Sequence, residues 1–271
     1  MSEIIEVSSQ WLTLREQEDA RARSSELALA AADRLAPGPI VIHDLGSGTG
    51  SMMRWLAPLL PGPQTWVLHD WNTDLVERAT SGVVPLDRER RPVSVRTRTG
   101  GLAHLDPDDL DGAALVTASA LLDVLTSEEL CAVVRACVAV GCPVLLSLSV
   151  TGEIRLDPRD PRDDVFEASF NAHQQRRVSG RRLVGPSSVG LAQDLFLEAG
   201  WNIRPAATFW RLGDHDPHLL GQWFDGWFEA ALEQRADLQV DGAGYRALRS
   251  SQLRRGALSA VVVHTDLLAW P

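Results

Sequence analysis

The sequence predicts an α/β protein, with a mostly parallel β-sheet covered by helices. Three observations indicate this fold. Between residues 40 and 150, short apolar runs rich in β-branched residues alternate with segments of helical periodicity. The last of these runs, CPVLLSLSV, is apolar on both faces, as expected of a parallel strand that helices cover on each side. With 45% apolar residues among 271, the chain can also fill a large core. We therefore expect a three-layer α/β sandwich.

Each element follows from its local composition. Residues 9–35 are rich in helix formers and stop before Pro37, which predicts one or two helices. PIVIHD then predicts a strand, and a glycine-rich turn leads from it into the helical MMRWLAPLL. Further strands are predicted at TWVLHD, PVSVRTRT, AALVTASALLDVL and CPVLLSLSV, with helices at TDLVERATS and SEELCAVVRACVAVG.

This alternation ends after Val150. Residues 151–188 are polar and rich in Pro, Arg and Asp, which predicts a long loop that is functional or disordered. A helix is then predicted at SVGLAQDLFLEAGW, a strand at WNIRPAATFWRL and a last strand at ALSAVVVHTDLLAW. Two or three helices should fill the interval of about 214–256 between these two strands. Within it, Trp223 and Trp227 share a stripe that is either core or the wall of an apolar pocket.

The charge balance bears on the class of ligand. The chain has 26 basic and 36 acidic residues, hence a formal net charge of -10, which disfavours a sequence-independent grip on nucleic acid. Cys131, Cys137 and Cys142 lack the spacing of metal ligands, so no metal site is expected and the thiols are interpreted as reduced. No apolar leader or membrane span is evident, and we expect a cytoplasmic protein.

The strongest motif is HDLGSGTG, at the end of the first predicted strand. Gly46, Gly48 and Gly50 allow a tight turn and close approach of the backbone to a ligand. The third glycine comes one residue too early for the dinucleotide fingerprint. Asp44 would also repel a pyrophosphate, whereas a carboxylate there suits a ligand that carries positive charge. These features disfavour a nicotinamide oxidoreductase.

The segment from Asp44 to Gly50, with Ser47 inside it, resembles the first motif of the class I S-adenosylmethionine-dependent methyltransferases, acidic-x-Gly-x-Gly-x-Gly. The resemblance covers roughly residues 40–150 and 191–267. It implies a seven-stranded sheet with a reversed last strand, and S-adenosylmethionine as cofactor with its methionine end over the glycine loop.

The resemblance assigns further cofactor contacts. Asp70 ends the second strand, where the family places an acidic residue on the ribose hydroxyls, and Trp71 or Asn72 follows beside the adenine. After the third strand the sequence departs from the family, because Gly101 stands at the expected acidic position. Backbone groups near Gly101 and Leu102, or His104, would then hold the adenine. Residues matched to the cofactor's sulfonium side, after the fourth strand, are Ala118 and Ser119.

Groups that would handle the methyl acceptor are predicted elsewhere. His173 lies in the segment after the fifth strand, at the sheet edge where ligands bind, and is the first candidate for a catalytic base. Asp123 is a second candidate, with a helix-dipole role as the alternative. Asn171, Arg176 and Arg177 are candidate substrate ligands, and Arg181 and Arg182 extend this arginine cluster; an exposed loop is the alternative.

The predicted N-terminal helix supplies one more candidate. Trp11, Arg15, Asp19 and Arg23 recur at i, i+4 spacing along one face, which either forms ion pairs on a helix surface or places Arg15 on a substrate.

We therefore expect a single methyltransferase domain over residues 1–271, with N-terminal lid helices over 1–36, a cofactor-binding half over 40–150 and a substrate-side half over 151–271. Both the N-terminal helices and the insertion at about 214–256 are expected to form the lid. The predicted reaction is methyl transfer to an oxygen or nitrogen of a small, anionic metabolite. RNA or protein methylation, and a non-catalytic cofactor-binding subunit, are the alternatives. No DPPY or NPPY string follows the fourth strand, which disfavours methylation of nucleic-acid base amines.

Overall fold

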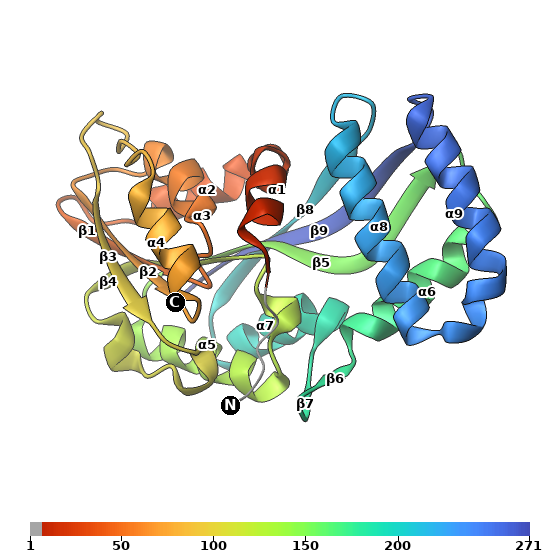
Figure 1. Ribbon diagram of the computed structural model, residues 1–271. Helices are drawn as coiled ribbons and strands as arrows, with labels where there is room; N and C mark the ends of the chain where they lie inside the picture. Colours follow the sequence, from red (N-terminus) through yellow and green to blue (C-terminus); the bar gives the residue numbers. More distant parts are fainter. Residues whose placement is uncertain (1–6) are drawn as a thin grey trace.

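The computed structural model describes residues 7–271, apart from the side chain of His104, and is built on one seven-stranded sheet (Figure 1). The strand order is β3-β2-β1-β4-β5-β9-β8. Strands β1 to β5 pair in parallel, whereas β9 runs antiparallel to both β5 and β8. The predicted fold class and the reversed last strand are thus confirmed. The strands are β1 Ile40–Leu45, β2 Gln64–Asp70, β3 Ser94–Thr99, β4 Ala113–Ser119, β5 Val144–Asp157, β8 Asn202–Leu212 and β9 Ser259–Trp270.

Helices cover both faces of the parallel part of the sheet. Side chains of successive strand residues point to opposite faces, so Leu145 joins one core and Leu146 the other. One face packs against α5 (Ser127–Val140) and α7 (Ser188–Glu198). On the other face lie α2 (Ser25–Ala32), α3 (Ser51–Leu56) and α4 (Thr73–Ser81). Burial of each Leu or Val in these layers contributes roughly 1.5–3 kcal/mol.

The outer halves of β5, β8 and β9 extend beyond the parallel strands and carry a separate helical layer (Figure 1). This layer consists of α6 (Asp163–Gln174), α8 (Pro217–Gln234) and α9 (Gln239–Arg254). Trp223 and Trp227 are buried in the core beneath it. Their stripe is therefore core packing.

The loop predicted over residues 151–188 is wrong, because most of this segment is regular structure. Strand β5 continues to Asp157, with Ile154 and Leu156 buried and paired to β9. Helix α6 follows and buries one side against α8, with Phe166 in the shared core. A short hairpin of β6 (Arg177–Val178) and β7 (Arg181–Arg182) comes next. Many polar residues in this segment occupy exposed positions of these elements, whereas Asp163, Ser169 and His173 are buried in α6.

The remaining helices complete the inventory. The N-terminal α1 (Ser9–Ala22) begins at the N-cap Ser8, whose hydroxyl accepts the N–H of Trp11. Within residues 7–271, no helix is both long and apolar enough to cross a membrane. The short 3₁₀ helices are η1 Ala57–Leu59, η2 Leu102–His104, η3 Pro107–Leu110, η4 Leu122–Val124, η5 Gly185–Ser187 and η6 Ala236–Leu238.

Candidate functional site

A cavity of about 250 Å³ opens where β1, β2, β3 and β4 end. The carboxyl ends of parallel strands meet at one edge of an open α/β sheet, which is the usual place for a ligand. The loops after these strands supply most of the lining, and α1 closes one side. Predicted cofactor residues that line the cavity are Asp44, Gly46, Ser47, Gly48, Asp70, Trp71, Gly101, Leu102 and Ser119.

The glycine loop requires its glycines for two reasons. Gly46 has φ +62° and Gly48 has φ +54°, in the left-handed region that disfavours residues with a Cβ. A Cβ at Gly46 would also lie 2.7 Å from Leu121 Cδ1. The N–H of Ser47 donates to the carbonyl of His69 at 2.9 Å, which fixes the loop against the end of β2.

Asp44 presents a buried carboxylate at the base of this loop. Its Oδ1 accepts the hydroxyl of Thr117 at 2.8 Å, while its buried Oδ2 has no hydrogen-bond partner among the described residues. Burial raises the pKa of Asp44 to about 7, although Thr117 and Arg23 act in the opposite direction. An unpaired buried acceptor is costly, so this oxygen favours a ligand that brings a donor or positive charge.

Asp70 ends β2 and organises two neighbouring loops. Its Oδ2 accepts the backbone N–H of Gly48 at 2.8 Å, and its Oδ1 accepts that of Asn72 at 2.9 Å. The carboxylate lines the cavity and retains further lone pairs for a ligand. Trp71 follows it as a partly exposed ring on the cavity wall. Asn72 instead caps α4, with its side chain accepting the N–H groups of Asp74 and Leu75.

Three other predicted cofactor residues are not among the described residues that line the cavity. Gly50, with φ +81°, is the N-cap of α3, Asn72 is the N-cap of α4, and Ala118 is a buried β4 residue in the core. They hold the loops that form the wall.

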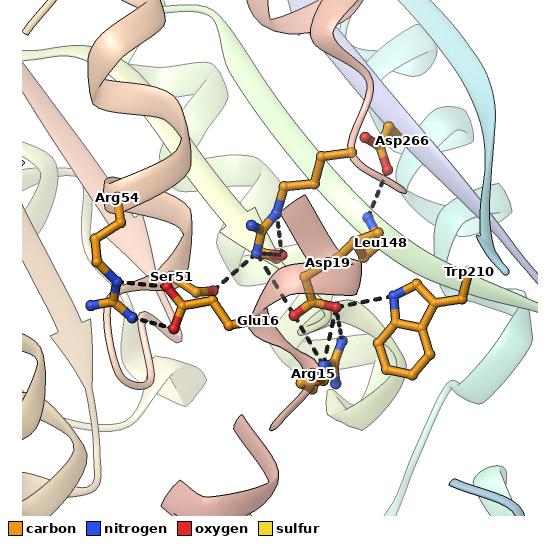
Figure 2. A network of polar contacts seen from close by, with 10 residues as sticks. Arg15, Glu16, Asp19, Ser51, Arg54, Leu148, Trp210 and Asp266 are labelled. Carbon is orange, nitrogen blue, oxygen red and sulfur yellow. Dashed lines mark hydrogen bonds and ion pairs between the residues drawn. The ribbon is translucent and has the colours of Figure 1, made fainter. Parts of the chain in front are cut away.

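Helix α1 packs across the glycine loop, and its polar face is buried. Leu12 Cδ1 lies 3.2 Å from the position of a Cβ on Gly48. Figure 2 shows Asp19 between Arg15 and Trp210; Arg15 Nε and Trp210 Nε1 donate to its carboxylate at 3.0 and 3.1 Å. Both Arg15 and Asp19 line the cavity. The polar line predicted on this helix is thus an internal network.

Arg23, at the end of α1, connects this helix to the start of α3 and to the end of β4. Its Nη2 donates to the hydroxyls of Ser51 and Ser119, each at 3.0 Å. The next residue, Ser24, donates its N–H to Asp266 Oδ2 at 2.8 Å. Asp266 Oδ1 accepts the N–H of Leu148 at 2.7 Å (Figure 2). These bonds join the start of α2 to β9 and to the bend in β5.

An ion pair between Glu16 and Arg54 connects α1 to α3. Glu16 faces Arg54 of α3 at 2.7 Å (Figure 2). Arg54 also donates to the carbonyl of Thr49 at 2.6 Å. The sequence pattern identified the line through Arg15, Asp19 and Arg23, but it missed Glu16, Ser51 and Asp266. Their partners lie on other elements, so no local spacing marks them.

His173 lies in α6, away from the cavity. Its Nε2 contacts Glu233 at 3.1 Å and its Nδ1 contacts Arg176 at 3.2 Å, so both ring nitrogens have partners. Burial and Arg176 lower the pKa of His173. Asn171 donates to the carbonyl of Gly152 at 2.8 Å. The predicted site residues His173, Asn171 and Arg176 are not among the described residues that line the cavity.

Asp123 lies in η4, between the cavity-lining Leu121 and Val124, but does not itself line the cavity as far as the structure describes it. Burial raises the pKa of Asp123, and Arg15 partly offsets this. Arg177 lies on the β6–β7 hairpin, outside the cavity. Its Nη1 donates to the carbonyl of Gly180. The side chain of His104 lies outside the described part of the chain.

The structure adds lining residues that the sequence patterns did not single out. Leu12, Ala120, Leu121, Val124, Leu125 and Glu129 all line the cavity. Ala120 has φ +50°, an uncommon conformation for a residue with a Cβ, and it follows β4 at the site edge. Within residues 7–271, no group of three or more His, Cys, Asp or Glu side chains is placed to hold a metal ion.

Comparisons with known proteins found only distant structural similarity. No family model matches the chain, and no curated protein matches its sequence. An S-adenosylmethionine-dependent methyltransferase from Geobacter sulfurreducens is 17% identical, with 97% of this chain and 98% of that chain covered and a TM-score of 0.45. Phosphoethanolamine N-methyltransferase 2 of Haemonchus contortus is 14% identical over 96% of this chain, which spans 56% of that protein, with a TM-score of 0.46. A cyclopropane synthase from Mycobacterium tuberculosis is 13% identical, covering 91% and 82% of the two chains, with a TM-score of 0.46.

The charges that line the cavity restrict the class of ligand that it can bind. Asp44 and Asp70 line a cavity that has a glycine loop between them. Two carboxylates oppose a pyrophosphate and favour cationic groups and hydroxyl donors. The sheet at whose edge they lie has the seven strands and the reversed last strand that the resemblance to class I methyltransferases implies.

Proposed function

We propose that this protein transfers a methyl group from S-adenosylmethionine to an oxygen or nitrogen of a small molecule. The observation that carries the proposal is the position of Asp70, whose carboxylate lines the cavity while it holds the backbone of Gly48 and Asn72. This preorganised acceptor suits the two hydroxyls of a ribose.

The residues of the cavity fit this cofactor. The unpaired Oδ2 of Asp44 suits an ammonium group, and Gly46 and Gly48 bring backbone without a Cβ to the cavity wall. Trp71, Gly101 and Leu102 would flank the adenine, with Ser47 and Ser119 nearer the methionine end. S-adenosylmethionine supplies a methyl group on a sulfonium, which is already activated towards a nucleophile.

The protein's own contribution is then alignment and exclusion of water. Helix α1, in the predicted N-terminal lid, closes the cavity through Leu12, Arg15 and Asp19. The helices α8 and α9 of the predicted insertion contribute no lining residue in the described part of the chain. His173 and Asp123 stay candidate bases, and either would need to act from outside the cavity as it stands.

The proposal is tested by cofactor binding. S-adenosylhomocysteine should bind the wild-type protein in calorimetry, and NAD should not. Asp70→Asn should weaken the binding about 10-fold or more, because a charged acceptor is lost. Asp74→Asn, an exposed acidic residue in the first turn of α4, is the matched control and should leave the affinity unchanged.

The acceptor class needs a second measurement. When the protein is incubated with a cell extract and S-adenosylmethionine labelled on its methyl group, the label should appear in extractable small molecules. Label in RNA or protein would contradict the acceptor class but not the cofactor. If the cofactor binds and no labelled product forms, the chain is a non-catalytic cofactor-binding subunit.

A further inference from the structure

A second, open cavity of about 700 Å³ adjoins the first. The two share Ala103, Glu129 and Arg181 as lining residues, so these side chains form the boundary between them. The outer cavity lies between the start of α5 and the β6–β7 hairpin.

The two cavities differ in the charge of their walls. Four carboxylates and two arginines line the inner cavity: Asp19, Asp44, Asp70, Glu129, Arg15 and Arg181. In the outer cavity the balance reverses, with three arginines and two carboxylates: Arg177, Arg181, Arg182, Glu128 and Glu129. An acidic inner wall suits a cationic donor, and the arginine-rich outer wall suits an anion.

Arg181 has an unused donor at the boundary. Its Nη2 donates to Glu129 Oε2 at 2.5 Å, whereas its buried Nη1 has no partner among the described residues. The Arg181 side chain is only 17% exposed. The same Oε2 of Glu129 also accepts the N–H of Thr126 at 2.8 Å, in the capping box that starts α5. The ion pair with Glu129 therefore leaves one buried N–H group of the Arg181 guanidinium without a hydrogen-bond acceptor among the described residues.

The hairpin that carries Arg181 is anchored to the segment before α5. The N–H of Val184 donates to the carbonyl of Leu125 at 2.9 Å, and Leu183 forms a β-bridge with Thr126. Because Leu125 also lines the inner cavity, Arg181 is held at a fixed position between both cavities.

We propose that the outer cavity binds a carboxylate or phosphate group of the methyl acceptor at Arg181, with Arg177 and Arg182 supporting it and Glu129 competing for the same guanidinium. The rest of the acceptor extends past Arg181 into the inner cavity. This inference rests on the proposed function for the acceptor's identity, but the anion site itself does not depend on it. The sequence predicted Arg176 as an anion ligand, but its guanidinium contacts His173. We therefore assign the anion contact to Arg181.

The test uses inorganic phosphate and acetate as separate probes, titrated into the protein saturated with S-adenosylhomocysteine at constant ionic strength. One saturable site is expected, and the probe that binds more tightly identifies the group. Arg181→Gln should weaken that binding about 10-fold or more. Arg135→Gln, an exposed arginine on α5 that lines neither cavity, is the control and should bind as the wild type does.

Glu129→Gln gives the sharper result. Glutamine can still cap α5, but it no longer competes as an anion, so anion binding should tighten several-fold. Weaker binding in Glu129→Gln, or equal affinities in Arg181→Gln and Arg135→Gln, would overturn the proposal. Salt-dependent binding of a single-stranded RNA oligonucleotide that is lost in Arg181→Gln would overturn it as well. Failure of S-adenosylhomocysteine to bind would refute the proposed function alone, because the anion titrations can be repeated on the free protein.

Discussion

The guanidinium of Arg23 reaches from the end of α1 to the hydroxyl of Ser119 at the end of β4, with 3.0 Å between Nη2 and Oγ. Ser119 lines the cavity, and Arg23 is buried directly behind it. The N-terminal helix is thus fastened to the same strand end that borders the proposed methyl donor.

Arg23→Gln should destabilise the protein and loosen α1. Removing one partner from a buried charged network costs about 3–5 kcal/mol, because the remaining polar groups lose their partner. Denaturant unfolding measures the loss. Arg21→Gln, on the same helix but with an exposed side chain, should cost about 1 kcal/mol or less. Equal losses in the two variants would show that the Arg23 contacts do not fasten the helix.

The affinity for S-adenosylhomocysteine should depend on pH through Asp44. Burial raises the pKa of Asp44 to about 7, and a ligand ammonium group favours its ionised form. Below that pKa, binding must displace a proton from Asp44, so the affinity should decrease by up to about tenfold for each pH unit. Above that pKa, the affinity should no longer depend on pH through this group. Calorimetry between about pH 5 and pH 7.5 measures this slope.

Two variants assign this pH dependence. Asp44→Asn should bind more weakly and with a flat profile, whereas Asp74→Asn should keep the wild-type slope. A wild-type slope that persists in Asp44→Asn would place the titrating group elsewhere.

Gly46→Ala should impair both folding and cofactor binding. The left-handed φ of +62° costs a residue with a Cβ roughly 1–2 kcal/mol, and the added methyl would meet Leu121 at 2.7 Å. Gly226→Ala provides a control of opposite sign, since it lies inside α8 with nothing within 4 Å of the new Cβ. That change should stabilise the helix by roughly 0.5–1 kcal/mol. Melting temperatures and S-adenosylhomocysteine titrations of both variants decide the matter.

The sequence predicted β1, β2, β4 and the inner half of β5 because these strands are largely buried and consist of near-continuous apolar runs, whereas the edge strand β3 is exposed. It failed for the outer half of β5, where Glu153, Arg155 and Asp157 alternate with buried residues. That half is stabilised by pairing with β9, so that Arg155 lies opposite Val261, more than a hundred residues later. Pairing with a strand so distant in the sequence cannot be recognised from the local sequence of the segment.

The candidate site likewise contains residues that a local pattern predicts and residues that only the fold brings together. Asp44, Gly46 and Gly48 belong to one strand and its turn, so their spacing carries the information. Arg181 and Glu129 are 52 residues apart and meet only through the fold. His173 was placed near the site because its segment resembled a loop at the sheet edge. In the structure it belongs to α6 and contacts Glu233 of α8.

Acid should destabilise the fold through a buried histidine pair beneath the glycine loop. His43 Nδ1 and His69 Nε2 are 2.9 Å apart, and burial with the nearby His43 lowers the pKa of His69 from 6.5 to about 4. As the pH falls from 6.5 towards 4, the unfolded chain binds a proton that the folded chain does not, so the free energy of unfolding decreases.

The free energy of unfolding of His69→Asn should therefore decrease by about 1.4 kcal/mol less per pH unit than that of the wild type over this range. His218→Gln, at the start of α8, should keep the wild-type slope. Urea unfolding at several pH values measures all three slopes, and identical slopes in His69→Asn and the wild type would refute the assignment.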